Sequence, residues 1–377
     1  MNVFDLELNI RFESAAHAGD AVYLTGSLNH WQQDGMLLGN IPGEQQELNV
    51  LLKNVPEDLL EFRLSRGGWS AISCLPDGTL PAPFTFNING NTKLQVTVAA
   101  WSDDVPLSRV TKQVHWLSEA FFFPELDAHR KVWVYLPRSY MYSETKRYPV
   151  LYMHDGQHLF DEAPAAGRKG RVAWQVDQVL NHAADEAIVV AIAHGGEEPD
   201  RLHDYVVHPV AGMPEPSGRE YLKDIINTLK PYVDAHYRTR SDWQHTAMAG
   251  SSLGGLLTLY AGLMHPGHFA CLGIFSPSLW LDNRQVHTFI DTIPATEQEW
   301  QQTQSYYLYG GSLENRKIKA LAPVAMDKDI EHIAGVLCDS LKANVMSNIN
   351  PVGKHGVLYW QQAFPYFYEW WWQQMNK

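Results

Sequence analysis

Gly250-Ser251-Ser252-Leu253-Gly254-Gly255 is a run that predicts both a fold and a chemistry. It has the Gly-x-Ser-x-Gly form of a nucleophile elbow, a sharp turn between a strand and a helix that presents a serine, here Ser252. Residues 245–249 before the run are small and apolar, as in a short strand, and residues 256–264 after it form an apolar helical pattern. Because the elbow requires a strand, a turn and a helix in this order, we predict that Ser252 is a nucleophile.

Two other interpretations of the run fit less well. If Ser251 were the nucleophile, Ala249 and Leu253 would occupy the two glycine positions of the motif. A glycine-serine turn without any chemistry is the remaining alternative, because short patterns of this kind also occur by chance. The flanking strand and helix patterns favour the elbow.

The composition is typical of a soluble globular protein. Of the 377 residues, 45% are hydrophobic and 19% are charged, and the net charge is −13. An acidic chain is a poor nucleic-acid partner, because phosphate binding needs clustered Lys and Arg. No apolar run of about 18 residues occurs, so no membrane span is expected. Acidic residues near the start, where a secretory signal has basic ones, and three distant cysteines predict a cytoplasmic protein without disulfide bonds.

Residues 1–104 have a pattern of their own. Short alternating stretches, separated by Gly, Pro and Asn turns, predict an immunoglobulin-like antiparallel β-sandwich. Its expected strands cover residues 6–12, 21–24, 48–52, 60–64 and 93–98. The acidic, proline-containing run 101–106 predicts a domain boundary after residue 104.

Two pieces of this first domain resemble starch- and glycogen-binding modules. Residues 22–31 (VYLTGSLNHW) are similar to the strand and Gly-x-x-Asn-x-Trp opening of these modules, and residues 62–69 (FRLSRGGW) are similar to a later strand and tryptophan turn. The resemblance implies that Trp31 and Trp69 stack on sugar rings. The alternative is a domain that shapes the entrance of a neighbouring active site, and we favour it because two aromatic residues offer little binding surface.

Residues 105–377 alternate strands with helices, the pattern of a mostly parallel sheet covered on both faces. The elbow strand lies in the middle of this series, so we predict an α/β fold. The other expected strands cover residues 131–136, 148–153, 187–193 and 304–309, and the expected helices cover 174–183, 220–236 and 327–343.

A serine nucleophile needs a base within hydrogen-bonding reach. Five histidines follow Ser252, and His355 is the best candidate because it lies in a loop just before the final aromatic helix. An imidazole in such a loop can reach back over the edge of the sheet. The other four are His265, His268, His287 and His332.

The base in turn needs an acid, which in α/β-hydrolases lies between the serine and the histidine in the chain. Glu314 follows the strand expected over residues 304–309 and is our candidate. Asp327, Asp329 and Glu331 fall on the next helix, where a solvent-facing role is expected.

Five pieces of the chain from about residue 115 onward resemble the "Putative esterase" family of α/β-hydrolases. This family includes enterobactin-type siderophore esterases, feruloyl and acetylxylan esterases, S-formylglutathione hydrolases and mycolyltransferases. The pieces are residues 151–160 (LYMHDGQHLF), 249–255 (AGSSLGG), 275–280 (FSPSLW), the Gly-x-x-Glu run that ends at Glu314, and 353–355 (GKH).

The resemblance implies further site residues. The backbone N–H groups of Leu253 and Gln157 would form the oxyanion hole, which stabilises the negative oxygen of acyl transfer. Trp174 and Trp280 are similar to aromatic residues that line the substrate pocket, and Arg201 is similar to an arginine at the catalytic edge. Packing by the two tryptophans and a loop-anchoring salt bridge by Arg201 are the alternatives.

These residues predict a serine esterase that acts on a small-molecule or carbohydrate ester, such as a sugar or siderophore ester. No cofactor is expected, and no metal, because the glycine between His154 and His158 argues against a helix that would align them. The alternatives are acyl transfer to a carbohydrate alcohol and a carbohydrate-binding protein with a scaffold hydrolase domain.

The aromatic run 366–372 is expected to be buried, and any exposed part would suit a homodimer contact.

Overall fold

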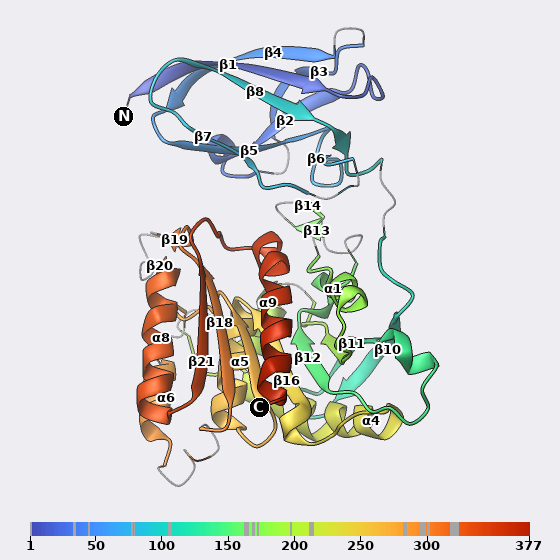
Figure 1. Ribbon diagram of the computed structural model, residues 1–377. Helices are drawn as coiled ribbons and strands as arrows, with labels where there is room; N and C mark the ends of the chain where they lie inside the picture. The colour runs from blue at the N-terminus through green and yellow to red at the C-terminus, as the bar shows by residue number, and fades with distance from the viewer. Residues whose placement is uncertain are drawn as a thin grey trace. The chain divides into compact units, whose positions relative to one another are not determined.

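The computed structural model describes residues 2–377 except 33–34, 44–45, 77, 79, 105–107, 162–165, 168–169, 172, 197, 211–214, 282–284, 295–298, 300–301 and 317–323. The chain divides into two compact units (Figure 1). The first unit comprises residues 1–109 and 161–173, and the second comprises 110–160 and 174–377. The boundary predicted after residue 104 adjoins residues 105–107, which lie outside the described residues.

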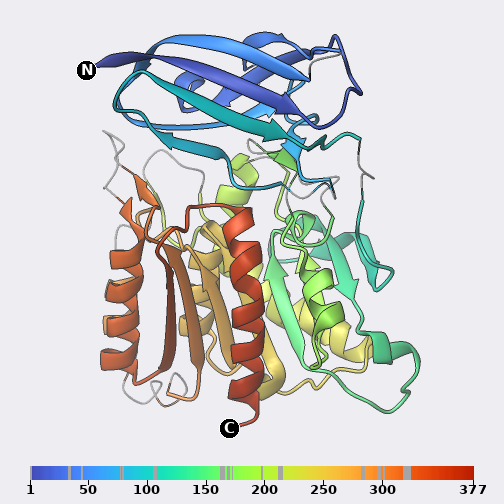
Figure 2. The same cartoon turned by 45° about the horizontal axis from the view of Figure 1, so that its top comes forward.

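The first unit is the predicted β-sandwich (Figure 2). One of its sheets has the strand order β4-β1-β8, and the other has the order β3-β2-β5-β7. Alternate residues of each strand, such as Leu6, Leu8 and Ile10, point into one shared apolar core. The strands are β1 (Val3–Phe12), β2 (Ala21–Gly26), β3 (Met36–Asn40), β4 (Glu47–Pro56), β5 (Leu59–Ser65), β7 (Phe84–Asn87) and β8 (Thr92–Val98). Short strands β6 (Ser73–Cys74) and β9 (Ala100–Trp101) pair separately, as do β13 (Ala166–Gly167) and β14 (Gly170–Arg171).

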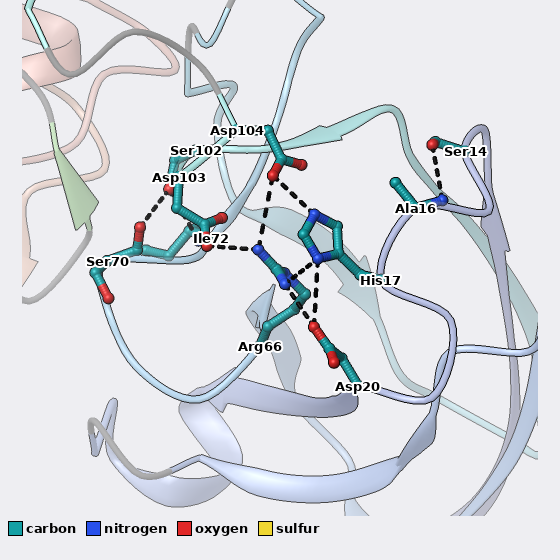
Figure 3. Close-up of polar contacts among 10 residues, drawn as sticks. All are labelled: Ser14, Ala16, His17, Asp20, Arg66, Ser70, Ile72, Ser102, Asp103 and Asp104. Carbon is teal, nitrogen blue, oxygen red and sulfur yellow. Dashed lines mark hydrogen bonds and ion pairs between the residues drawn. The ribbon is translucent and has the colours of Figure 1, made fainter.

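A cluster of charged side chains holds residues 103–104, at the end of the sandwich sequence, against two other segments of the same unit (Figure 3). The guanidinium of Arg66, whose side chain is 9% exposed, donates hydrogen bonds to Asp20 at 2.6 Å and to Asp103 at 2.5 Å. The imidazole of His17 lies between Arg66 and Asp104, with its Nε2 atom 2.7 Å from a carboxylate oxygen of Asp104. The cluster therefore joins three separate segments of the unit around the partly buried guanidinium of Arg66.

The second unit contains an eight-stranded sheet in the order β10-β11-β15-β12-β16-β17-β18-β21. β10 and β11 are antiparallel to their neighbours, and the strands from β15 to β21 are parallel. The strands are β10 (Val114–Phe123), β11 (Ala128–Tyr135), β12 (Val150–His154), β15 (Ile188–Ile192), β16 (Thr246–Ser251), β17 (Cys271–Phe275), β18 (Ser305–Gly311) and β21 (Asn344–Asn350). Central strands such as β15 are apolar at every position because both faces of the sheet are covered.

Helices cover both faces of this sheet. One face is covered by aromatic residues of α9 and by apolar residues of α1. The other face is covered by α3, α4, α5, α6 and α8. The helices are α1 (Val176–His182), α2 (Glu198–Tyr205), α3 (Gly218–Asp224), α4 (Lys230–His236), α5 (Leu253–Met264), α6 (Gln285–Thr292), α8 (Met326–Leu341) and α9 (Val357–Met375). A short pair, β19 (Asn315–Arg316) with β20 (Val324–Ala325), precedes α8. The predicted α/β fold is confirmed, and none of the helices in the described ranges is long and apolar enough to cross a membrane.

Candidate active site

The run around Ser252 forms a strained elbow. β16 ends at Ser251, α5 begins at Leu253, and Ser252 between them has φ 56° and ψ −117°, a conformation that L-residues rarely adopt. A Cβ atom at Gly250 would lie 2.6 Å from the carbonyl oxygen of Gly254, so only glycine lets the strand and the helix approach this closely. The Ser252 side chain therefore stands at the end of a strand with its backbone held on both sides.

The structure brings the three residues of the predicted triad together. The Nε2 atom of His355 lies 3.1 Å from the Oγ atom of Ser252, and the Nδ1 atom of His355 lies 2.8 Å from the Oε2 atom of Glu314. The side chain of Glu314 is 1% exposed, whereas that of His355 is 44% exposed. A buried carboxylate, an imidazole and a hydroxyl are thus joined by two hydrogen bonds in the order that acyl transfer requires.

The ends of parallel strands place these side chains. Ser252 follows β16, Glu314 follows β18, and His355 lies in the turn between β21 and α9. Because these strands are parallel, their carboxyl ends meet at one edge of the sheet, where ligand sites of open α/β sheets lie. The turn after β18 closes on Glu314 itself, since the N–H of Gly311 donates to Oε1 at 2.8 Å.

A second layer of hydrogen bonds holds Glu314. The hydroxyl of Ser276, at the end of β17, donates to Oε1 of Glu314 at 2.7 Å and accepts from the indole N–H of Trp360 at 2.9 Å. The Trp360 ring also contacts His355 edge to face, with the ring centroids 5.0 Å apart. Ser276 is fully buried and has a φ of 43°, which aims its side chain at the carboxylate. Ser276 and Trp360 therefore fix the carboxylate relative to the imidazole.

A second hydroxyl lies beside the first. The Oγ atom of Ser278 is 3.2 Å from that of Ser252, and the N–H of Ser278 donates to the carbonyl oxygen of Ser252 at 3.0 Å. Ser278 is buried. When the hydroxyl of Ser252 donates to His355, that of Ser278 is free to donate to Ser252 and so to fix its rotamer.

Arg201 connects the elbow with the loop after β12. Its guanidinium makes two hydrogen bonds to Asp155, at 2.7 and 2.8 Å, and its Nη2 atom lies 3.5 Å from the carbonyl oxygen of Ser251. Burial by itself would raise the pKa of Asp155, but the charge and hydrogen bonds of Arg201 outweigh it and hold that pKa well below the usual range. The geometry thus supports the loop-anchoring alternative for Arg201.

The two groups predicted for the oxyanion hole follow neighbouring strands. Leu253 is the first residue of α5, and Gln157 lies in the single 3₁₀ turn Gly156–His158 after β12. β12 and β16 pair directly, so the two backbone segments leave adjacent positions in the sheet. Asp155, which opens the 3₁₀ turn, is the residue that Arg201 holds.

The two tryptophans predicted in the substrate pocket have different positions. Trp174 is 2% exposed and packs against Phe275, Trp360 and Phe364, with ring centroids 4.9, 5.9 and 6.1 Å away. This position supports the packing alternative for Trp174. Trp280 is partly exposed and packs at the edge of the apolar core.

His154, which could have suggested a metal ligand, is buried among aromatic rings. Its ring centroid lies 5.3 Å from that of Tyr205 and 5.7 Å from that of Tyr221. Both ring nitrogens are buried without a hydrogen-bond partner in the described part of the chain, and burial lowers the pKa of His154 to about 4. Among the residues that the structure covers, no group of three or more His, Cys, Asp or Glu is arranged to hold a metal ion.

Comparison with known proteins identifies the family. The model of the family described as "Putative esterase" matches residues 124–329, more than half of the chain. The chain belongs to the Putative esterase family. The family and the fold predicted from the five motifs are thereby confirmed.

Individual relatives of this esterase-family chain cover less of it. The siderophore triacetylfusarinine C esterase of Aspergillus fumigatus is 31% identical over 156 residues, 38% of this chain and 50% of that protein. An uncharacterized protein of Bacillus subtilis, YbbA, is 27% identical over 161 residues, 41% of this chain and 59% of its own length. The chain thus spans about half the length of these curated relatives.

A solved structure matches over both units. The enterobactin esterase of Shigella flexneri, in the presence of 2,3-dihydroxy-N-benzoyl-serine, has a TM-score of 0.57 and 16% identity, and the match covers 97% of this chain and 90% of that one. At this identity the match shows a shared fold.

Ser276, Ser278 and Trp360 are residues of the candidate site to which the sequence pattern assigned no role. Ser276 and Ser278 follow an apolar strand directly, in the motif of residues 275–280, and this position at a strand end was a usable signal. No comparable signal marked Trp360, because its indole N–H reaches Ser276 across 84 residues of sequence.

Proposed function

We propose that this chain hydrolyses carboxylic esters, with Ser252 as nucleophile, His355 as general base and Glu314 as the acid that orients it. The observation that carries the proposal is the pair of hydrogen bonds from the Ser252 hydroxyl through His355 to a buried carboxylate. It gains support from the strained elbow, since backbone strain of this kind concentrates at active sites.

In the first half of the proposed reaction, the Oγ atom of Ser252 attacks the ester carbonyl carbon while its proton moves to Nε2 of His355. The carbonyl oxygen becomes an oxyanion, which accepts hydrogen bonds from the N–H groups of Leu253 and Gln157. The tetrahedral intermediate then collapses, the bond to the alkoxy group breaks, and His355 gives its proton to the departing alcohol. An acyl group remains on Ser252.

In the second half, His355 takes a proton from water, and the resulting hydroxide attacks the acyl carbon. The intermediate releases the carboxylic acid, and the proton returns to Ser252. The proposed reaction uses protein groups and water alone. Acyl transfer to an alcohol differs only in the molecule that attacks in this half, and hydrolysis in the presence of added sugars or glycerol distinguishes the two by their products.

Hydrolysis of a short-chain p-nitrophenyl ester tests the proposal. Ser252→Ala should reduce turnover to the background rate, because it removes the group that the other two activate. Ser251→Ala is the matched control, since Ser251 is the neighbouring serine of the same elbow and His355 bonds to Ser252, and it should retain turnover. A serine-directed phosphonate should label Ser252 and no other serine. Full turnover in Ser252→Ala would exclude this mechanism.

The names of the relatives suggest two substrate classes. One relative is a siderophore esterase, and another is an endo-1,4-beta-xylanase/feruloyl esterase of Xylanibacter ruminicola, 27% identical over 152 residues. We propose a substrate from one of these classes, a siderophore ester or a sugar ester. A panel of aryl, feruloyl, acetyl-sugar and catecholate esters, ranked by kcat/KM, separates the classes.

A further inference from the structure

A groove of about 990 Å³ lies in the second unit beside β21 and α9. β21 is the last strand of the sheet, and among the described strands its one neighbour is β18 (Figure 1). Residues of β18 and β21 line the groove together with one face of α9. The residues that line the groove do not include Ser252, His355 or Glu314, so the groove is distinct from the site of the proposed reaction.

The strands supply hydrogen-bonding groups that are already oriented. The amide nitrogen of Asn348 donates to the hydroxyl oxygen of Tyr307 at 2.7 Å, and that of Asn350 donates to Tyr309 at 3.4 Å. Burial raises the pKa of both tyrosines to about 12, so both hydroxyls keep their protons. Both tyrosines are 1% exposed, so they anchor the asparagine side chains and do not themselves face the solvent. Asn348 and Asn350 are partly exposed, and their side-chain amides are the polar groups that a ligand in the groove can reach.

The helix supplies two aromatic rings one turn apart. Tyr366 is 64% exposed, and Trp370 is partly exposed with its ring centroid 5.7 Å from that of Tyr307. Both residues line the groove. Their spacing of four residues places them on the same face of α9. Exposed aromatic rings beside polar side chains suit a ligand that has both an apolar face and many hydroxyl groups.

The charge of the groove limits the kind of ligand. Among the described residues that line it, Glu369 is the single charged one, and none is Lys, Arg or His. An anionic ligand would find no cation among these residues. A second copy of this chain, docked through the same face, would bring another Glu369 and no compensating charge. A neutral ligand rich in hydroxyl groups meets neither difficulty.

We propose that this groove binds a neutral oligosaccharide. Tyr366 and Trp370 stack on the apolar faces of sugar rings. The side-chain carbonyl oxygens of Asn348 and Asn350, whose amide groups are held by Tyr307 and Tyr309, accept hydrogen bonds from sugar hydroxyls. The volume is at the upper end of the range of about 300–1,000 Å³ for small-ligand sites, so a short chain of sugars fits better than one sugar. Such a site would hold the protein on a glycan independently of the chemistry at Ser252.

The test uses the full chain and four probes, namely maltohexaose, cellohexaose, xylohexaose and chitohexaose. Calorimetric titration should give a Kd in the millimolar range for at least one of them. Tyr366→Ala should weaken that binding by about tenfold, the effect of losing roughly 1.4 kcal/mol of contact energy. Tyr142→Ala is the matched control, because Tyr142 is 88% exposed on another part of the same unit, and it should bind as the parent does.

Each other outcome would overturn the proposal. Flat titrations with all four probes would exclude a neutral glycan. Binding that survives Tyr366→Ala and disappears in Trp31→Ala would place the sugar on the sandwich instead. A parent dimer in sedimentation that Tyr366→Ala converts to a monomer would make a second copy the occupant. Hydrolysis of a p-nitrophenyl ester should be equal in parent and Tyr366→Ala, so a failure of this proposal is distinguishable from a failure of the esterase mechanism.

Discussion

The replacement of Glu314 by Gln tests the proposed triad at its most specific point. The Oε1 atom of Glu314 accepts from Gly311 and Ser276, and Oε2 accepts from Nδ1 of His355. In Glu314→Gln, the amide oxygen can keep the two bonds at Oε1, which leaves the NH₂ group facing His355. The amide then donates to Nδ1, and the imidazole proton moves to Nε2, where it points at Ser252. This tautomer cannot accept the serine proton.

The expected loss is large in activity and small in stability. Enforcing the wrong tautomer in a serine triad lowers kcat on the order of 10⁴-fold, or about 5.5 kcal/mol of transition-state stabilisation. The bonds to Gly311 and Ser276 remain but lose the strength that a charged acceptor gives, which costs about 1 kcal/mol. For a unit of this size such a loss lowers Tm by about 2–4 °C.

The assay is turnover of a p-nitrophenyl ester, together with thermal unfolding of the same preparations. Asp327→Asn is the control, because Asp327 lies in the first turn of α8 and accepts from the N–H of Lys328. It should leave turnover within twofold or so of the parent. If Asp327→Asn abolished turnover and Glu314→Gln retained it, the placement of the acid after β18 would be refuted.

Three further results are expected. Ser276→Ala should lower kcat by about tenfold with KM unchanged, because it removes one hydrogen bond from Glu314, worth about 1.4 kcal/mol; an unchanged kcat would show that this bond does not matter. Burial lowers the pKa of His154 from 6.5 to about 4, so between these values the unfolded chain binds more protons and the free energy of unfolding falls as pH falls, by about 3 kcal/mol at most from this group. Urea unfolding from pH 7 to 4.5 measures this, and His154→Asn should show a shallower dependence than the parent. If the sandwich binds glycan, Trp31→Ala and Trp69→Ala should weaken maltohexaose binding at millimolar concentrations, whereas unchanged titrations would favour a different role for that domain.

Local patterns were sufficient for part of the site. The elbow around Ser252 could be predicted because its glycines, strand and helix are consecutive in the sequence. Glu314 could be proposed because it follows the apolar strand expected over residues 304–309, and His355 because it lies in a loop just before the final aromatic helix. The distances between the Ser252, Glu314 and His355 side chains depend on the register of the parallel strands that precede them. That register cannot be read from a single sequence.

Other features depend on contacts between distant segments. β21 was not predicted, because three asparagines and a serine make it polar for a strand, and its pairing with β18 is what orders it. Ser276 acts on Glu314 only because its backbone adopts a positive φ and because Trp360 approaches from α9. Trp174 resembled a pocket residue, but its neighbours Phe275 and Phe364 enclose it. The sequence around Trp174 gives no indication that Phe275 and Phe364 lie next to it in the fold.

The unequal exposure of His355 and Glu314 has a consequence for the acyl intermediate of the proposed reaction. With 44% of its side chain exposed, the imidazole can exchange protons with bulk solvent directly, and no relay of internal groups is needed. In the proposed reaction, the attacking water can approach the imidazole from the same exposed side. An enzyme that passes its acyl group to a second alcohol has to keep water away from the intermediate, since water is present at about 55 M. We infer that the open side of this imidazole favours hydrolysis, and that any competing acceptor alcohol must displace solvent from it.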